Sequence, residues 1–391
     1  MNAGEHWDLA IVGAGPAGAT TAISALTRSP GLRVLLLDRD DFPRDKSCGD
    51  GIAPHAVDVL DRLGAGDVVH GWTPLRRLDL ARGERRVEGR LARSAWVIPR
   101  ATFDARLVRH AIAAGAELVR HRVRNIRVDR DVVTLDGTFT AAVVVGADGA
   151  HSVVRRAAGS RPRGSSALAI RGYAPTTALI EGRQVIRYGS RAQPAYAWAF
   201  DRGDGLANVG YGEVVRDGAT LSRDLLLDQL DLLVPGVVAG ATSWRAHHLP
   251  LSGWGWGAEQ PDGPFLLVGD AAGLINPMTG EGIYYAVATG EIAGRTAVDA
   301  LRAGQPAGAG ARHRDAVRTL LDRHLKHTWA ASRLCRRPLI VEAGIGSAAR
   351  SQPVFDDLVE LGLGDGRITR RLISGLAREL VPHRSTQRGK P

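Results

Sequence analysis

The spacing of hydrophobic and polar positions is clearest in the first forty residues of the chain. A short apolar run at residues 8–12 enters a glycine-rich turn, and a helical run without a breaker extends to Pro30. A second apolar run, residues 34–37, ends in an acid. Short apolar runs between turn signals are typical of buried strands, whereas the longer run is typical of a helix. The pattern predicts a βαβ unit over residues 8–38.

The rest of the chain alternates between strand-like and helical spacing. Strands are expected at residues 76–97, 117–133, 141–145, 167–211 and 265–268. Helices are expected at residues 55–63, 101–115, 221–233, 282–303 and over most of 311–380. Turn formers dominate residues 42–52, which predicts a loop, and residues 382–391 are expected to form a disordered tail.

Residues 344–349 have a Gly-x-Gly-x-x-Ala spacing after an apolar run, which imitates a second nucleotide-binding turn. Too little chain remains after it for another βαβαβ half. We therefore predict a helix–turn–helix at this point.

Strands that end in glycine turns recur near residues 13, 148 and 269, with antiparallel-looking strands between them. This order predicts an α/β fold, in which a discontinuous Rossmann-type domain is interleaved with a mixed or antiparallel-sheet substrate domain, plus C-terminal helices. The expected nucleotide-binding domain comprises residues 1–75, 98–160 and 262–310. The expected substrate domain comprises residues 76–97 and 161–261, and the helical region residues 311–391.

The first turn has the Gly-x-Gly-x-x-Gly spacing of a dinucleotide-binding unit. Gly13 suits the tight turn, Gly15 the approach of a pyrophosphate, and Gly18 the packing of helix on strand. An acid 20 residues after Gly18 stands where a carboxylate accepts hydrogen bonds from ribose hydroxyls. The candidate cofactor contacts in this unit are Gly13, Gly15, Pro16, Ala17, Gly18, Asp38 and Arg39. The turn alone does not separate FAD from NAD.

The composition is that of a globular protein with a strong excess of arginine. The net charge is +10, and lysine occurs only at Lys46, Lys326 and Lys390. Solvated surface arginines are the simplest explanation; attraction to anionic cofactors, diphosphate substrates or membrane surfaces is a second one. Nucleic acid is a poor partner, because the arginines are scattered and no binding motif accompanies them.

Cysteine usage and hydropathy suggest where the protein works. The two cysteines give neither a disulfide framework nor a metal-binding spacing, so no metal site is expected. We see no signal peptide and no apolar run long enough to span a bilayer. A cytoplasmic protein is expected, with peripheral membrane association as an option; the oligomeric state and the substrate stay open.

Three separated motifs resemble the FAD-dependent monooxygenases and reductases of the aromatic-hydroxylase fold. They are the first glycine turn with its acid, residues 143–149 (Val-Val-Val-Gly-Ala-Asp-Gly) and residues 266–272 (Leu-Leu-Val-Gly-Asp-Ala-Ala). The resemblance implies FAD as the cofactor. It adds as candidate contacts Asp148, Gly149, Gly269, Asp270 and Arg100. The alternatives are a solvated turn residue for Asp148 and a surface arginine for Arg100.

A further glycine-rich turn, residues 277–282, opens a long helix. Amides at a helix N-terminus can stabilise negative charge on a reduced flavin ring, and glycines allow the backbone to lie flat against it. The candidate contacts in this turn are Gly280, Glu281, Gly282 and Ile283 for the cofactor and Pro277 for the substrate.

Within the superfamily the chain most resembles the geranylgeranyl reductase family. Residues 46–51 resemble its Lys-x-Cys-Gly-x-Gly loop, residues 196–200 its Tyr-x-Trp-x-Phe segment, and residues 279–283 its Thr-Gly-Glu-Gly-Ile turn. There are departures: Asp201 replaces a usual proline, Gly273 the histidine of aromatic hydroxylases, and Tyr284 their asparagine.

The family resemblance implies hydride transfer from reduced flavin to a carbon–carbon double bond, with NAD(P)H as the expected electron donor. Cys48 and Gly49 would contact the flavin, with Cys48 as a candidate proton donor. Tyr196, Trp198 and Phe200 alternate, so in a strand they share one face and could stack an apolar chain.

Other interpretations remain open at this stage. Cys48 could be a small buried filler, and the three aromatic residues could be ordinary core side chains. An oxygen-using FAD monooxygenase of a natural-product pathway would share the three cofactor motifs. A flavin-binding protein without turnover is the third hypothesis.

Overall fold

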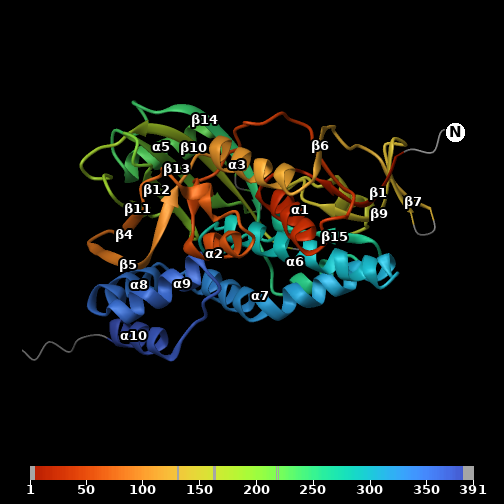
Figure 1. Cartoon of the computed structure of the whole chain (residues 1–391). Helices are drawn as coiled ribbons and strands as arrows, with labels where there is room; N and C mark the ends of the chain where they lie inside the picture. The colour runs from red at the N-terminus through yellow and green to blue at the C-terminus, as the bar shows by residue number, and fades with distance from the viewer. Residues whose placement is uncertain (1–4, 130–131, 162–163, 217, 219, 382–391) are drawn as a thin grey trace, which may run out of the picture.

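The computed structural model describes residues 5–129, 132–161, 164–216, 218 and 220–381 of the 391-residue chain. It contains two sheets and a set of C-terminal helices that run beneath both (Figure 1). The predicted α/β class with C-terminal helices is confirmed. The expected tail at 382–391 lies outside the described residues.

The first sheet has seven strands in the order β6-β2-β1-β9-β8-β7, with β15 paired to β9. Their bounds are Glu5–Val12 (β1), Val34–Asp38 (β2), Glu117–Arg120 (β6), Ile126–Asp129 (β7), Val132–Leu135 (β8), Phe139–Gly146 (β9) and Phe265–Leu267 (β15). The pairs β1–β2, β1–β9, β2–β6 and β9–β15 are parallel, and β7 and β8 extend the sheet antiparallel. The central strands carry continuous apolar runs, residues 9–12, 34–37 and 141–145, because a parallel sheet is covered on both faces.

The second sheet has eight strands in the order β14-β10-β13-β12-β11-β4-β5-β3. Their bounds are Gly51–Ile52 (β3), Leu75–Arg82 (β4), Arg85–Val97 (β5), Ser166–Pro175 (β10), Gln184–Tyr188 (β11), Ala195–Asp201 (β12), Leu206–Val214 (β13) and Thr242–Pro250 (β14). Its neighbours are antiparallel except for the parallel pair β4–β11. Strand β3 pairs with β5, so part of the predicted 42–52 loop joins this sheet; the division into domains stays a prediction.

Ten α-helices are found in the described residues. Their bounds are Pro16–Arg28 (α1), Pro54–Arg62 (α2), Arg100–Ala113 (α3), Val153–Ala157 (α4), Arg223–Leu233 (α5), Ile283–Arg302 (α6), Ala309–Leu334 (α7), Pro338–Arg350 (α8), Gln352–Leu363 (α9) and Arg370–Leu380 (α10). Short 3₁₀ turns occur at Gly66–Val69 (η1), Trp256–Glu259 (η2), Gly269–Ala272 (η3) and Pro306–Gly308 (η4). None of the helices in this part of the chain is both long and apolar enough to cross a membrane.

Helices α1 and α6 are in close contact, and this contact fixes the two turns that matter most below. A Cβ atom on Gly290 would lie 2.5 Å from the carbonyl oxygen of Ala17, and one on Gly294 would lie 2.5 Å from that of Thr21. Real Cβ atoms do not approach so closely, so only glycine permits this spacing. The N-terminal turns of both helices are thereby brought to one end of the first sheet.

The prediction of a helix–turn–helix at residues 344–349 is wrong, because these residues lie inside the uninterrupted helix α8. The glycines serve close packing instead of a turn. A Cβ atom on Gly346 would lie 2.7 Å from an oxygen of Glu379, and one on Gly344 would lie 4.0 Å from Leu376, both on α10.

The C-terminal helices share a hydrophobic core with the second sheet. Val341 and Ile345 of α8 and Phe355 of α9 pack with Leu78 and Val87 of β4 and β5. A Cβ atom on Gly89 would lie 2.3 Å from the ring of Phe355, so this glycine leaves the space that the ring fills. Helices α8 and α9 are therefore part of the folded body, on the side of the second sheet.

We predict that Phe355→Ala destabilises the protein by about 3–5 kcal/mol, because the ring is only 1% exposed and its removal leaves a cavity against β5. Chemical denaturation followed by circular dichroism measures the loss. Leu232→Ala on α5 is the control: its side chain is 66% exposed, so we expect a change within about 0.5 kcal/mol. Equal effects of the two variants would contradict the packing described here.

Candidate functional site

The first glycine turn presents main-chain groups to a large cavity. Gly13 has φ +101°, and a Cβ atom on it would lie 2.3 Å from the carbonyl oxygen of Ala147. A Cβ atom on Gly18 would lie 1.8 Å from the carbonyl oxygen of Gly13, so Gly18 packs the helix on the turn and does not line the cavity. Gly15 is the N-cap residue of α1, so no side chain is hydrogen-bonded to the amides at this helix end. It lines the cavity together with Pro16 and Ala17.

The carboxylate at the end of β2 lies beside this turn. Asp38 accepts hydrogen bonds from the amides of Ala14 at 2.8 Å and Asp40 at 3.1 Å. Arg44 approaches the same carboxylate at 3.5 Å. Asp38 is buried, whereas Arg39 is exposed at the edge of the cavity, where it pairs with Asp40.

Arg100 is not a surface residue. It is buried at the start of α3, and its guanidinium donates two hydrogen bonds to Asp104 at 2.6 and 2.8 Å. Arg44 donates to the same carboxylate at 3.1 Å. Both arginines line the cavity near Gly15, so positive charge is held where the sequence predicts a pyrophosphate.

The ends of β9 and β15 bring two further carboxylates to the cavity. Asp148 accepts from the amide of Val153 at 2.6 Å, while its other oxygen is buried and has no partner among the described residues. Burial raises the pKa of Asp148. Asp270 forms an ion pair with Lys46 at 2.9 Å. Burial alone would raise the pKa of Asp270, but the charge of Lys46 outweighs it, so this pKa lies below its ordinary value.

The two glycines of these turns have different surroundings. Gly149 lines the cavity. Gly269 lies behind the cavity wall, where a Cβ atom would meet Ala286 of α6 at 3.2 Å.

The turn at the N-terminus of α6 lines the same cavity. Gly280 has φ +74°, and Gly282 caps the helix without a side-chain hydrogen bond. Glu281 is aimed back at the helix and accepts from the amide of Tyr284 at 2.8 Å; burial raises the pKa of Glu281 to about 7. Pro277 and Ile283 line the cavity beside these residues.

The cysteine loop is attached to the second sheet by a buried polar network. Asn208 of β13 donates 2.8 Å hydrogen bonds to the carbonyl oxygen of Cys48 and to the carboxylate of Asp50. Tyr173 of β10 donates to the same carboxylate at 2.6 Å. Burial raises the pKa of Asp50 to about 6 and that of the Cys48 thiol above its ordinary value. Cys48 lines the cavity and Asp50 supports it from behind.

Three alternating aromatic residues of β12 form a wall beside this loop, on one face as their spacing predicts. Ring centroids of Tyr196 and Trp198 lie 6.0 Å apart, and those of Trp198 and Phe200 lie 6.4 Å apart. Tyr188 of β11 continues the row at 6.0 Å from Tyr196. A Cβ atom on Gly49 would lie 3.6 Å from Phe200, so the cysteine loop packs directly against the aromatic wall.

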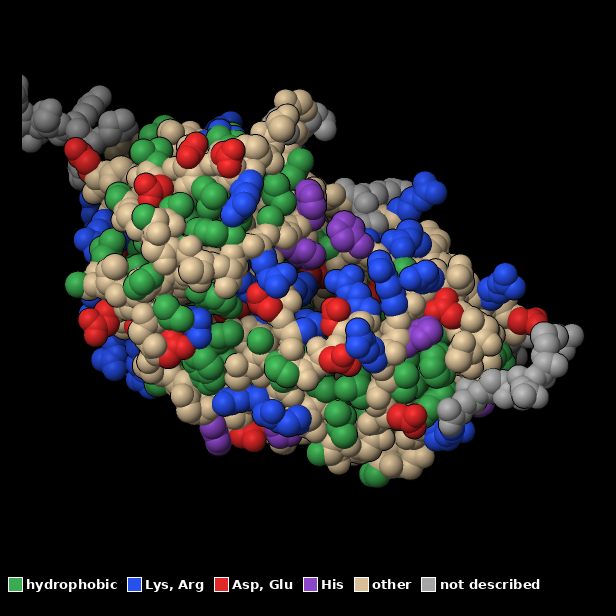
Figure 2. Space-filling model, turned by 90° about the horizontal axis from the view of Figure 1, so that it is seen from above, with side chains coloured by type: hydrophobic (Ala, Val, Ile, Leu, Met, Phe, Trp, Pro, Cys, Tyr) green, Lys and Arg blue, Asp and Glu red, His purple; other side chains and the backbone are tan. Residues whose placement is uncertain are grey.

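All of these features border one cavity of about 1280 Å³. Every site residue expected from the sequence lines it except Gly18 and Gly269. The polar end includes the exposed residues Arg122, Arg156 and Arg245. Figure 2 shows a hollow in one face of the molecule, with Lys, Arg and His side chains gathered around it.

The opposite end of the cavity was not foreseen from the sequence. Helices α7–α10 supply an apolar lining that includes Ile345, Leu358, Leu361, Leu372 and Leu376, together with Cys335 just after α7. A signal was present: Ile373, Leu376, Ala377 and Leu380 follow the i, i+3, i+4, i+7 spacing of a helix face. All four line the cavity.

The polar end fits FAD, the cofactor that the motifs imply. The amides at the N-terminus of α1 have no side-chain cap, and two arginines and the carboxylate of Asp38 stand around them. Helix N-termini and cations bind phosphates, and a carboxylate at this strand end binds ribose hydroxyls. The buried carboxylate oxygen of Asp148 that has no partner among the described residues is a further hydrogen-bond acceptor in this wall. The residue-by-residue cofactor assignments stay predictions.

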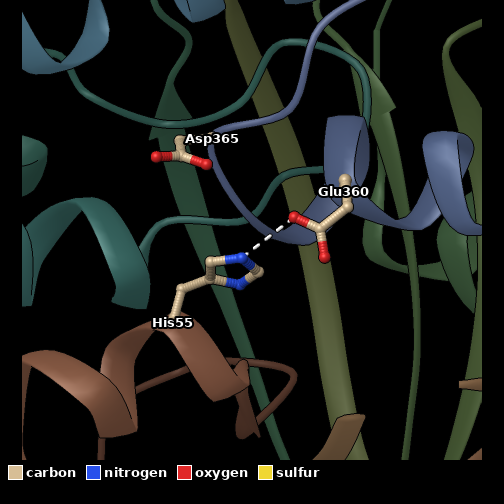
Figure 3. A group of neighbouring side chains, drawn as sticks. All are labelled: His55, Glu360 and Asp365. Atoms are coloured by element: carbon tan, nitrogen blue, oxygen red, sulfur yellow. Dashed lines mark ion pairs between the residues drawn. The ribbon is translucent and has the colours of Figure 1, made fainter. Parts of the chain in front are cut away.

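Outside the cavity lining, His55, Glu360 and Asp365 come together, although no metal site is expected from the sequence (Figure 3). Their ligand atoms all lie within 4.8 Å of one another, and His55 pairs with Glu360 at 2.9 Å. The carboxylate of Asp365 lies close to both groups, but no ion pair joins it to either (Figure 3). We interpret the group as an ion pair that ties α2 to α9.

This ion pair should make a contribution to the free energy of unfolding that depends on pH. The hydrogen bond that the His55 ring donates to the Glu360 carboxylate raises the pKa of His55 above 6.5 and lowers the pKa of Glu360 below 4.5. The histidine contribution is complete below pH 6.5 and is lost as pH rises through its raised value. The glutamate contribution is complete above pH 4.5 and is lost as pH falls through its lowered value.

We therefore expect Glu360→Gln to lower the free energy of unfolding most between pH 4.5 and 6.5. The loss should be about 0.5–1 kcal/mol, because Glu360 is 42% exposed and solvent screens the pair. Urea unfolding of both proteins at several pH values measures it. A difference that does not change with pH would contradict the ion-pair interpretation.

Gly15→Val should abolish cofactor binding without disturbing the fold. The backbone at Gly15, φ −68° and ψ −172°, accepts any residue, and a Cβ atom there would meet nothing closer than 3.4 Å. The added methyl groups would fill the space expected for the pyrophosphate. Flavin absorbance per polypeptide measures binding, and apoprotein melting measures folding. Full flavin content in this variant would remove the proposed pyrophosphate position.

Comparison with known proteins agrees with this geometry. Residues 6–194 match the family described as FAD binding domain. The chain is 31% identical over 310 residues to the menaquinone reductase of Mycolicibacterium smegmatis, covering 73% of this chain and 75% of that protein. It is 33% identical over 326 residues to digeranylgeranylglycerophospholipid reductase 1 of Methanopyrus kandleri, covering 76% and 81%.

A solved structure has the same fold along nearly the whole length. The geranylgeranyl bacteriochlorophyll reductase-like protein of Thermoplasma acidophilum superposes with a TM-score of 0.80 at 19% identity, over 96% of this chain and 97% of that one. The resemblance drawn from the sequence motifs is confirmed, and with it FAD as the cofactor and an oxidoreductase as the class of protein. The chain belongs to the geranylgeranyl reductase family of FAD-dependent oxidoreductases.

Proposed function

We propose that this protein reduces carbon–carbon double bonds in a prenyl chain, using electrons from bound FAD. One observation carries the proposal: a single cavity runs from the expected flavin contacts, past Cys48 and the aromatic wall, into a channel lined by α7–α10. A polar headgroup would not suit that channel, whereas a long apolar chain would. Two relatives are named for a menaquinone and for a digeranylgeranyl lipid, and both compounds carry polyprenyl chains.

The aromatic wall supports the orientation of such a substrate. Tyr196, Trp198 and Phe200 are held in one row by β12, and Trp198 is further fixed by its 2.8 Å hydrogen bond to Asn208. Tyr196 donates a hydrogen bond to the carbonyl oxygen of Thr279 in the turn before α6. The wall is thus tied to both the cysteine loop and the expected flavin turn, which favours one fixed position for an alkene between them.

FAD, when bound and reduced, supplies a hydride to one carbon of the double bond. The other carbon needs a proton, and the Cys48 thiol is suited to hold it because burial keeps the sulfur protonated. Transfer of this proton leaves a thiolate, which Arg100 and Lys46 stabilise electrostatically until the sulfur takes up a proton from solvent.

The electron donor proposed for this reaction is NAD(P)H, bound transiently at the basic polar end. We further propose that the protein works at a membrane surface. Its long apolar channel would receive a chain that is poorly soluble in water.

The decisive experiment is anaerobic. Reduced holoenzyme is mixed with prenyl diphosphates, prenyl quinones or prenyl lipids, and flavin reoxidation is followed at its visible absorbance. Reoxidation together with a product heavier by two hydrogens supports the proposal. No reoxidation with any class, together with substrate-dependent oxygen uptake in air, would favour the monooxygenase alternative.

Leu376→Trp should shorten the accepted chain. Leu376 lies on α10 and lines the apolar end, far along the sequence from the flavin turns. A bulkier ring there leaves the polar end intact, so we expect at least about tenfold lower kcat/KM for a C20 chain and little change for a C10 chain. Steady-state rates with both lengths test this. Equal losses for both lengths would place the substrate elsewhere.

A further inference from the structure

The cavity has an apolar opening at the C-terminal helices. Among the described residues, three large hydrophobic side chains are both exposed and part of the lining: Leu334 of α7, and Ile373 and Leu380 of α10. All three come from the C-terminal helices, and none comes from the flavin end. Figure 1 shows α10 at the lower outer edge of the molecule, with α8 between it and the second sheet. The apolar channel therefore reaches the surface there.

Helix α10 buries only part of its apolar face. Leu372 is buried and attaches the helix to α9 and α7. The stripe Ile373, Leu376, Ala377 and Leu380 instead lies along the opening, and Ile373 is 56% exposed. An exposed stripe of this kind on a folded protein marks a surface that meets another apolar phase.

Two exposed hydrophobic side chains lie next in sequence to the lining residues Ile340 and Leu380. Leu339, at the start of α8, is 67% exposed, and Val381, just after α10, is 65% exposed. Neither lines the cavity. We call Leu334, Leu339, Ile373, Ala377, Leu380 and Val381 the apolar rim.

The charges beside the apolar rim are positive. Arg336 and Arg337 lie between α7 and α8, and Arg370 begins α10; all three are exposed. Within the described part of the chain, no ion pair is recorded for any of the three. The acid of α10, Glu379, is buried and paired with Arg350, so it does not offset them at the surface.

We propose that the apolar rim docks onto the headgroup region of an anionic lipid bilayer, so that a membrane-dissolved prenyl chain passes directly into the cavity. The inference rests on the proposed function for its substrate. An amphipathic helix with arginines beside its apolar stripe lies in the interface plane, where apolar burial and attraction to anionic lipids act together. Continuity between the rim and the channel gives the docked protein a route for the chain.

The test uses the full-length holoenzyme and flotation with vesicles. Wild-type protein should float with vesicles of phosphatidylcholine and phosphatidylglycerol and much less with phosphatidylcholine alone. The double variant Leu339→Asp/Val381→Asp should lower the partition coefficient by about tenfold or more. Arg336→Gln/Arg337→Gln should lower it about fivefold per arginine on the anionic vesicles. Leu232→Asp, at an exposed position of α5 away from the rim, is the matched control and should bind as wild type does.

Flavin reoxidation separates this proposal from the proposed function. With detergent-dispersed substrate the Leu339→Asp/Val381→Asp variant should react at the wild-type rate, and with vesicle-borne substrate it should be slower. If wild-type protein fails with dispersed substrate, the proposed function fails whatever the vesicles show. Unchanged flotation of the double variant overturns the docking surface. So does equal binding to both vesicle types, or a wild-type dimer in sedimentation that the double variant dissociates.

Discussion

The site depends on the close approach of two main-chain turns at the end of the first sheet. The turn after β1 touches the turn after β9 so closely that a Cβ atom on Gly13 would lie 2.3 Å from the carbonyl oxygen of Ala147. Parallel strands present their carboxyl ends at one edge, and ligands bind in α/β sheets at that edge. Because β2 and β15 belong to the same sheet, Asp38 and Asp270 arrive at the same cavity. A side chain at Gly13 would separate the turns and disperse these groups.

The second sheet reaches this edge through the cysteine loop. Lys46 pairs with Asp270 of the first sheet, while Asn208 and Tyr173 of the second sheet hold Asp50. Buried polar groups are costly unless they have partners, so such a network favours one arrangement of the loop over all others. The loop is thus fixed between the two sheets, and Cys48 is held between the expected flavin turn and the aromatic wall. The chemistry proposed for its thiol requires this fixed position.

The sequence predicted the parts of the structure that follow from local spacing. The spacing of hydrophobic residues and the glycine turn predict the βαβ unit. The alternation of Tyr196, Trp198 and Phe200 is enough to predict that they share one face of a strand. The partners of Asp50 could not be predicted, because Tyr173 and Asn208 lie more than 120 residues away and meet it only through tertiary folding. The helix–turn–helix prediction at Gly346 was wrong for a related reason. This glycine allows α8 to pack closely against α10, and the local sequence does not reveal that contact. The apolar channel was not predicted, because the sequence indicates that α7–α10 are helices but not which surface they line.

The two ends of the cavity place different demands on the chain. At the flavin end, the arginines, carboxylates and main-chain amides predicted to contact FAD act through directional hydrogen bonds, which explains why the motifs are recognisable there. At the far end the contacts are apolar and non-directional, and an extra methylene in such a pocket changes binding by only about 1–3 kcal/mol. Many side-chain combinations on α7–α10 satisfy such contacts, so this end leaves no motif. For the prenyl substrate that we propose, this end selects by length and width of the chain rather than by functional group. In this protein the C-terminal helices are therefore the part proposed to choose the substrate, and the turns of the two sheets are the part proposed to carry the reaction.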